Sequence, residues 1–329
     1  LKKTLTLNRV VSTLEKNMKA VSNDELLDRM ETTISYVKSL ATDIDDFIEQ
    51  NASDRVYYME GNNRALELKS SLVECQESFK ELISEYESVI MTSATLASGG
   101  DFIFLKNRLG IEDFKERIIG SPFDYKKQAL LYVDKNLPLP DKENNEIFQE
   151  ESLKVIEGLI NASHGRALVL FTSYKHLYFV SNNIKIHYPF KSQGDMPPAR
   201  LIQWFKNTSH SVLLATATFW QGIDIKGEKL SLVIIARLPF TSPGDPVYQE
   251  RCRRLRDRWF GELALPSAIL VLRQGFGRLI RGRNEYGVVA ILDTRLVTRS
   301  YGNTIVSSLP EINIVHNVED VRDFFDSIS

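Results

Sequence analysis

The fold of this chain is decided at residues 274–281, where the sequence reads Gln-Gly-Phe-Gly-Arg-Leu-Ile-Arg. Apolar residues recur at helical spacing before and within this stretch, Pro266 suits the first position of a helix, and Gly282 suits its end. The octet is therefore predicted to close a helix. Arg278 and Arg281 are three residues apart, so they share one face of that helix.

The side chains at this helix end form a candidate receptor for phosphate. Gln274 lies one turn before Arg278 on the same side, while Gly275 and Gly277 remove side-chain bulk where another surface could come close. Two guanidinium groups and an amide that converge on one place can bind phosphate oxygens in a fork-shaped geometry. The alternative, from these residues alone, is an amphipathic helix with solvated arginines.

The composition describes a globular chain of 329 residues, with 43% hydrophobic and 26% charged residues. This length suffices for one large domain and a smaller one. The formal net charge is −2, yet residues 241–300 contain eleven Arg, six acidic residues and no Lys. The arginines between residues 251 and 258 are a candidate contact face for phosphate or nucleic acid; the alternative is a solvated face balanced by acidic residues.

Several classes of protein are excluded by pattern. The chain has no apolar run of 18 residues and no signal-peptide pattern, so we expect a cytoplasmic protein that is not bound to a membrane. Cys75 and Cys252 are the only cysteines and lie far apart, which excludes a four-thiolate cluster or a Cys-rich zinc site within this chain. We therefore expect no metal site here. Because residue 1 is Leu, we expect a fragment of a longer protein.

The first third of the chain is predicted to be mixed. Residues 4–50 have apolar residues four and three apart, which predicts a helical hairpin whose second helix Ser22 can cap, with Glu25 closing a capping box. Alternation at residues 55–60 and 66–72 predicts two strands. A short helix around residues 79–86 and an apolar strand at residues 88–91 are expected to follow, and then a helix over residues 101–109.

The rest of the chain alternates strand and helix. Apolar runs occur at residues 129–133, 167–171, 211–215, 231–236 and 287–292. Helical patterns at residues 174–184 and 198–206 lie between the runs at 167–171 and 211–215. Two more, at residues 246–258 and 266–281, lie between the runs at 231–236 and 287–292. Continuous hydrophobicity indicates strands buried on both faces, and helix-length crossovers indicate parallel pairing. The predicted fold is an α/β parallel sheet with helices on both faces, whose working loops lie at the carboxyl ends of the strands.

Polar residues follow three of the predicted strands. Thr172, Ser173 and Tyr174 begin a helix, where backbone N–H groups can hold a phosphate of a nucleic-acid backbone; the alternative is an ordinary helix cap. The sequence Thr-Ser-Ala-Thr at residues 92–95 supplies hydroxyls that can link a nucleotide site to its surroundings; the alternative is an ordinary turn.

The segment after the strand at residues 211–215 offers a second set of polar groups. Thr218 carries a hydroxyl for a phosphate, Gly222 permits close backbone approach, and Asp224 can accept from a ribose hydroxyl. Trp220 can stack on a base, although aromatic residues beside a sheet more often belong to the core.

Taken in order, these stretches resemble motifs III, IV, V and VI of superfamily 2 nucleic-acid motors, at residues 92–95, 171–174, 214–224 and 274–281. The octet and the Thr-Ser-Ala-Thr sequence look like the DinG branch of the DinG/XPD helicases. The resemblance covers nearly all of the chain and implies a RecA-like fold. Gln221 stands where many relatives carry Glu, which leaves no carboxylate at that position.

The resemblance also implies roles for individual residues. Arg278 and Arg281 would be arginine fingers that reach the γ-phosphate of ATP, an interaction worth roughly 10³ to 10⁵ in rate, with Gln274 assisting. The implied nucleotide-binding residues are Gly277, Gly222, Asp224 and Thr95. The implied contacts to single-stranded DNA are Thr172, Ser173, Tyr174, Thr218 and Trp220.

A motor of this kind also needs a Gly-x-x-x-x-Gly-Lys-Ser/Thr loop and an acidic pair, and this sequence contains neither. ATP and Mg²⁺ are therefore expected to be held mainly by an upstream RecA-like domain, where the family's iron–sulfur cysteines would also lie. The chain alone is expected to bind single-stranded DNA weakly and to hydrolyse no ATP. The alternative is a non-catalytic nucleic-acid or protein clamp on the same fold.

The resemblance divides the chain into three parts. Residues 1–54 would be part of an arch-like helical insertion. Residues 55–96 would be a segment of strands and helix that completes the first RecA-like domain. Residues 97–329 would be the second RecA-like domain.

Overall fold

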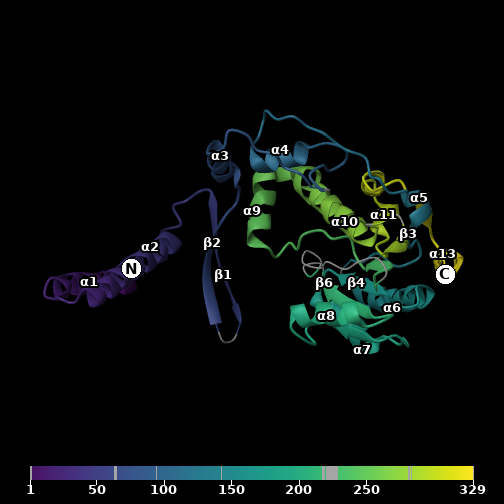
Figure 1. The fold of residues 1–329 in the computed structure, drawn as a ribbon, viewed down its shortest axis with the longest axis horizontal. Coiled ribbons are helices and arrows are strands. Elements are labelled where there is room, and N and C mark those ends of the chain that lie inside the picture. Colours follow the sequence, from purple (N-terminus) through teal and green to yellow (C-terminus); the bar gives the residue numbers. More distant parts are fainter. Residues whose placement is uncertain are drawn as a thin grey trace. The chain divides into compact units, whose positions relative to one another are not determined.

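The computed structural model describes residues 2–328, except 63–64, 94, 142, 217–218, 220–228, 281 and 283, and omits the side chains of residues 2–5, 62 and 278. The chain forms two compact units, which Figure 1 shows as a ribbon. The first unit is Leu1–Glu77 with Ser242–Arg254, and the second is Ser78–Thr241 with Leu255–Ser329. The first unit is thus discontinuous in sequence.

A helical hairpin opens the first unit, as predicted. Helices α1 (Lys2–Met18) and α2 (Asp24–Glu49) pack together, and Lys38 on α2 forms an ion pair of 2.7 Å with Glu15 on α1. The predicted cap is wrong by one residue. Asn23, not Ser22, caps α2, because its Oδ1 accepts a hydrogen bond of 3.0 Å from the Leu26 N–H. An Asn at this position satisfies one of the free N–H groups of the first turn.

Two antiparallel strands complete this unit and confirm the strands predicted there. Strand β1 (Arg55–Asn62) pairs with β2 (Ala65–Leu72). The Tyr57 hydroxyl on β1 donates to the Asp46 carboxylate of α2 at 3.0 Å, which ties the strands to the hairpin. Helix α9 (Pro246–Leu255) belongs to the same unit, and its Arg251 donates to the Val73 carbonyl at 2.6 Å.

The second unit is built on a seven-stranded sheet with the order β5-β6-β4-β7-β8-β3-β9. All neighbouring strands pair in parallel, as predicted. The strands are β3 (Ala129–Val133), β4 (Ala167–Phe171), β5 (Phe190–Ser192), β6 (Val212–Thr216), β7 (Leu232–Ile235), β8 (Gly287–Ile291) and β9 (Asn313–Val315). The central strands are buried along their whole length, which is why their sequences are continuously apolar.

Helices cover both faces of this sheet and form two separate cores. Helices α8, α10, α11 and α12 pack on one face, and α6, α7 and α13 pack on the other. Figure 1 shows α6, α7 and α8 gathered around β4 and β6. The bounds are α3 (Gln76–Ser84), α4 (Ile103–Leu109), α5 (Tyr125–Gln128), α6 (Asn145–Ala162), α7 (Tyr174–Asn183), α8 (Pro198–Asn207), α10 (Leu265–Leu279), α11 (Arg295–Thr298), α12 (Gly302–Ser307) and α13 (Val318–Ile328).

The strand predicted at residues 88–91 is wrong. These residues have no regular secondary structure, and Ile90 is 91% exposed. The described strands of this chain form two sheets, and neither includes residues 88–91. An apolar run without a neighbouring strand has no hydrogen-bonding partner for its backbone, so strand propensity alone cannot form one.

The helix predicted over residues 246–258 is also interrupted. Helix α9 ends at Leu255, and Arg256 takes a positive φ of 51° at the start of a 3₁₀ turn. A π-helical turn, Phe260–Ala264, then continues into α10. Pro266 is the second residue of α10, close to the predicted first position, although the π-helical turn leads directly into this helix. Because proline has no N–H, the α-helical bond to the Glu262 carbonyl cannot form, and the wider π-turn accommodates the gap.

Candidate nucleic-acid and nucleotide interface

Three predicted contact residues lie together at the carboxyl end of β4. Thr172, Ser173 and Tyr174 are exposed, although Phe171 directly before them is fully buried. Ser173 caps α7 by accepting a hydrogen bond of 3.3 Å from the His176 N–H. The alternative role of Ser173 as a helix cap is therefore confirmed, while its contact to a nucleic acid stays a prediction. The cap orients the first turn of α7 outward at the sheet edge.

Gln193, which the sequence did not single out, joins this turn to the end of the neighbouring strand β6. Its Oε1 accepts from the Thr216 N–H at 2.8 Å and from the Thr216 hydroxyl at 2.9 Å. Its Nε2 donates to the Tyr174 hydroxyl at 2.9 Å. Residues from motifs IV and V are thus held together by one amide. The only signal was position, because Gln193 directly follows the edge strand β5, which has just three residues.

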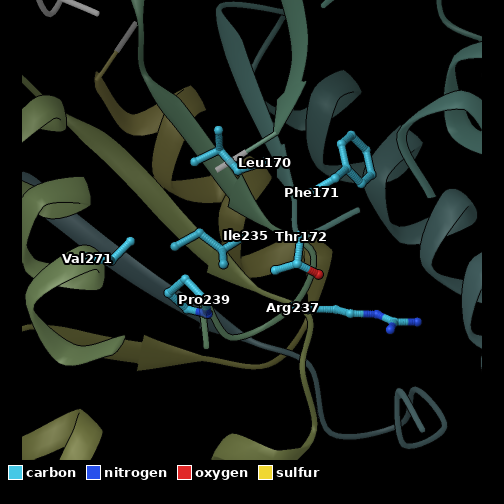
Figure 2. A pocket seen from close by; sticks show the side chains of 7 residues that line it. All are labelled: Leu170, Phe171, Thr172, Ile235, Arg237, Pro239 and Val271. Atoms are coloured by element: carbon cyan, nitrogen blue, oxygen red, sulfur yellow. The ribbon is translucent and has the colours of Figure 1, made fainter. Parts of the chain in front are cut away.

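The surface between β4 and β7 is filled rather than hollow. A hollow of about 10 Å³ there is lined by residues that include Leu170 and Ile235, and Figure 2 shows the Arg237 guanidinium extending away from these two side chains. This volume admits at most one water molecule, so it is not a nucleotide pocket. The Arg237 guanidinium lies 4.9 Å from the centre of the Phe148 ring and donates to Asn145 Oδ1 at 2.6 Å. Arg237 therefore has a structural role here.

His176 supports the same turn from inside the protein. Its ring is buried between Phe148 and Phe171 and lies 3.1 Å from the Ser152 hydroxyl. Burial, with a smaller contribution from the nearby Arg237 charge, lowers the pKa of His176 to about 3. His176 is therefore a neutral core residue at physiological pH and is not a candidate acid or base.

The predicted phosphate-receptor stretch, residues 274–281, contains the end of helix α10, which packs on the opposite face of the sheet from α7. Leu272, Phe276 and Leu279 are buried in the core under the sheet, which fixes the end of the helix. Gln274 is half-buried, and Gly277 is exposed. Apart from the helix's own backbone, a Cβ built on Gly277 would meet no atom of the described residues within 4 Å, so these residues leave the helix surface open here.

The motif III segment is attached to the same helix. Arg273 on α10 donates to the Ala97 carbonyl at 2.7 Å. Thr95 is half-buried two residues earlier, and its hydroxyl lies 3.2 Å from the Ser93 hydroxyl. Arg273 thus brings the segment that carries Thr95 to α10, one residue before Gln274. Sequence reasoning missed this contact because Arg273 is absent from the motif pattern.

Several predicted site residues lie outside the part of the chain that the structure describes. The backbone of Arg278 belongs to α10, but its side chain is not described. The others, of which neither backbone nor side chain is described, are Arg281, Gly222, Asp224, Thr218 and Trp220. Their roles stay predictions.

The arginines between residues 251 and 258 do not form one open basic face. Arg253 and Arg254 both pair with Glu250, at 2.6 and 2.8 Å, and their hydrogen bonds lower the pKa of that carboxyl to about 2. Arg258 pairs with Glu262 at 2.9 Å. The alternative, charge balanced by nearby acidic residues, is the better description of this run.

The described residues contain no group of three or more His, Cys, Asp or Glu side chains that could hold a metal ion. Neither Cys75 nor Cys252, both of which the structure describes, is part of a disulfide bond. Among the described residues, no helix is long and apolar enough to cross a membrane.

Comparison with known proteins shows the family to which this sequence is related. Residues 156–312 match the model of the helicase C-terminal domain. Over 308 residues, 92% of this chain and 46% of the relative, the sequence is 36% identical to "ATP-dependent DNA helicase YoaA" of Haemophilus influenzae. The chain belongs to the DinG-type helicases. A DinG-type relative in Escherichia coli, also named "ATP-dependent DNA helicase YoaA", is 38% identical over 80% of this chain and 42% of that protein.

The chain spans somewhat less than half the length of these relatives. A third, "3'-5' exonuclease DinG" of Bacillus subtilis, is 33% identical over 71% of this chain and 26% of its own length. Among solved structures, "XPD_Helicase" superposes with a TM-score of 0.61 at 15% identity, over 94% of this chain and 62% of that one. That likeness confirms the RecA-like fold predicted from the sequence.

Proposed function

We propose that this DinG/XPD-type chain supplies the second RecA-like domain of an ATP-dependent DNA helicase. One observation carries the proposal. The end of α10 bears Gln274, Gly277 and Arg278, and it packs in the core of the parallel sheet. The same sheet exposes Thr172 and Tyr174 at the carboxyl end of its central strand β4. A movement of the α10 end would then be passed through the packed sheet to the proposed strand contacts, as a motor requires.

In this proposal Arg278 and Arg281 reach the γ-phosphate of ATP that an upstream RecA-like domain holds with Mg²⁺. Arginine fingers stabilise the charge that develops in the transition state. Gln274 lies one turn before Arg278 on the same helix, which supports an assisting role. Gly277, Gly222, Asp224 and Thr95 would line the nucleotide side of the interface. Mg²⁺ would neutralise phosphate charge there, and this chain's part is to orient its arginines toward it.

The strand contacts are proposed at the carboxyl ends of β4 and β6. Thr172, Ser173 and Tyr174 are exposed there at the start of α7, which supports contact with the sugar-phosphate backbone of single-stranded DNA. Thr218 and Trp220 would extend that contact. Opening and closing of the cleft between the two RecA-like domains would then step the strand along.

The domain roles are proposed with the boundaries given by the motifs. Residues 1–54 would belong to an arch-like insertion, 55–96 would complete the first RecA-like domain, and 97–329 would be the second. The exposed apolar side chains of Val89 and Ile90 support this division, since exposed apolar surface suits contact with another domain.

The test is ATP turnover, with and without single-stranded DNA, of the protein extended upstream and of its Arg278→Ala variant. We expect turnover stimulated by DNA, and a loss of at least about a hundredfold in the variant with nucleotide affinity less affected. The matched control is Arg258→Ala, because Arg258 is paired with Glu262 on the surface and should matter little.

Two results would contradict the proposal. Normal turnover by Arg278→Ala would make that arginine surface charge, and absence of turnover in the extended protein would favour the non-catalytic clamp. The chain alone should hydrolyse no ATP, so appreciable turnover by the purified chain would also contradict the proposal.

A further inference from the structure

The direction of each hydrogen bond around Gln193 follows from one backbone group. The Thr216 N–H can only donate, so the atom that faces it at 2.8 Å must be the Gln193 carbonyl oxygen. The amide nitrogen then faces Tyr174 and donates to its hydroxyl oxygen at 2.9 Å. The orientation of the amide is therefore set by the fold of β6 rather than chosen freely.

This direction leaves the Tyr174 hydroxyl as a directed donor. Its oxygen accepts from Gln193, so its own hydrogen must point away from the amide. Among the residues that the structure describes, none accepts that hydrogen. The Tyr174 side chain is 50% exposed, so the hydrogen is available to a ligand that carries an acceptor oxygen.

A second tyrosine extends the same surface. Tyr178 lies one turn after Tyr174 on α7, and the two rings are stacked with centroids 5.9 Å apart and an angle of 29° between planes. Tyr178 is 51% exposed, so a large part of this aromatic pair faces solvent. Stacked tyrosines with exposed rings are suited to a flat partner such as a nucleobase.

We propose that Gln193 and Tyr178 complete a subsite for one nucleotide of a single strand around Tyr174. Gln193 is a positioning residue: it holds the Tyr174 hydroxyl so that its hydrogen is donated to a phosphate oxygen. The Tyr174–Tyr178 pair stacks on the adjoining base. The subsite rests on the proposed function, because it presumes that a single strand passes the carboxyl end of β4.

The role of Gln193 is tested by reversing one hydrogen bond. In Gln193→Glu a carboxylate oxygen still accepts from Thr216, but the second oxygen replaces a donor and takes the Tyr174 hydrogen for itself. Binding of an oligothymidylate to the full chain is measured by fluorescence anisotropy for Gln193→Glu, for Tyr174→Phe and for the double variant. Tyr174→Phe should weaken binding roughly five- to tenfold, as expected for a charge-assisted hydrogen bond at a partly exposed site.

The decisive comparison is the effect of Gln193→Glu on binding in the wild-type chain against its effect in the Tyr174→Phe variant. Gln193→Glu should weaken binding by at least the same factor in the wild-type chain, but in Tyr174→Phe it should add only the salt-screened repulsion of its new charge. Equal losses in both backgrounds would overturn the positioning role, since the glutamate would then act by charge or by misfolding. Thermal unfolding of each variant separates those two causes.

The stacking role is tested at Tyr178 with matched variants. Tyr178→Phe keeps the ring and should bind as the wild type does, whereas Tyr178→Leu should weaken binding about five- to tenfold. An oligonucleotide of abasic sites offers phosphate without bases, and on it the two variants should bind alike. Normal binding of the oligothymidylate by Tyr178→Leu would overturn the stacking role.

Failure of the subsite is distinguishable from failure of the proposed function. If the wild-type chain binds the oligothymidylate and the variants bind equally well, the subsite alone is wrong. If the wild-type chain binds no single strand at low salt, both the subsite and the proposed strand contact are wrong. The ATP turnover of Arg278→Ala in the extended protein is then still an independent measure of the motor.

Discussion

Gly277 offers a sharp test of how the end of α10 is used. It lies within the helix Leu265–Leu279 and is exposed, and outside the helix backbone no atom of the described residues lies within 4 Å of where a Cβ would stand. Replacing glycine by alanine in a helix lowers the conformational entropy of the unfolded chain and improves helix propensity. For Gly277→Ala in this chain we therefore expect a gain of about 0.5–1 kcal/mol in the free energy of unfolding, near the helix end. For a unit of this size that corresponds to a rise of about 1–4 °C in Tm.

The same methyl group should damage activity in the extended protein. If the nucleotide side of another RecA-like domain closes onto this helix end, a methyl at Gly277 holds the two surfaces apart. Misplacement of catalytic groups by about 1 Å can cost on the order of a hundredfold in rate. We expect DNA-stimulated ATP turnover of Gly277→Ala to fall at least about tenfold, although the folded domain is more stable.

Gly261 provides the matched control. It also has open space where the methyl of an alanine would stand, and it lies in the π-helical turn before α10, outside the motif. Gly261→Ala should leave turnover unchanged. A Gly277→Ala variant that is both stabilised and fully active would show that the glycine is not reserved for close approach. A destabilised Gly277→Ala would refute the open geometry itself.

Three further predictions concern stability. A Cβ on Gly287 would stand 2.6 Å from the Ser231 carbonyl oxygen and from Leu279 Cδ1, so Gly287→Ala should lower the free energy of unfolding by roughly 1–3 kcal/mol; an unchanged urea midpoint would contradict this. His176 has a pKa of about 3 when folded and 6.5 as its ordinary value. The unfolded chain therefore binds more protons between these two pH values, so the free energy of unfolding should fall as the pH drops from 6.5 toward 4. In His176→Gln, which lacks this group, the fall should be less steep. Arg273→Met removes the bond to the Ala97 carbonyl, which should speed limited proteolysis of residues 88–97; unchanged cleavage would show that the bond does not hold this segment.

The central strands of the sheet were predictable because burial on both faces leaves a continuous apolar signature. Strands β4 and β8 contain no polar residue, and the helices between the strands show regular apolar spacing. The edge strands β5 and β9 have three residues each and are largely half-buried or exposed, so no pattern marked them. The opposite error occurred at residues 88–91, where a strong apolar pattern has no strand to pair with among the strands that the structure describes.

The candidate site was predictable only as far as its motifs reach. The positions of Thr172, Ser173 and Tyr174 follow from the general placement of polar residues at the carboxyl ends of parallel strands. Gln193 and Arg273 could not be found in this way, since each acts through a bond to a residue distant in sequence. Such bonds depend on the path of the chain in space, which local spacing does not encode.

The strand order has a consequence for the newborn chain. Strand β3 is the first strand of the large sheet to be synthesised, yet its neighbours are β8 and β9, the last two. The ribosome adds residues 134–286, roughly 150 residues, between β3 and β8, which takes about 8–30 s at usual rates of elongation. During that interval Leu131 and Val133 have no permanent neighbours on either side of the strand. Nascent chains that stop before Gly287 should therefore aggregate or be retained by chaperones, whereas chains that extend past Val315 can close the sheet.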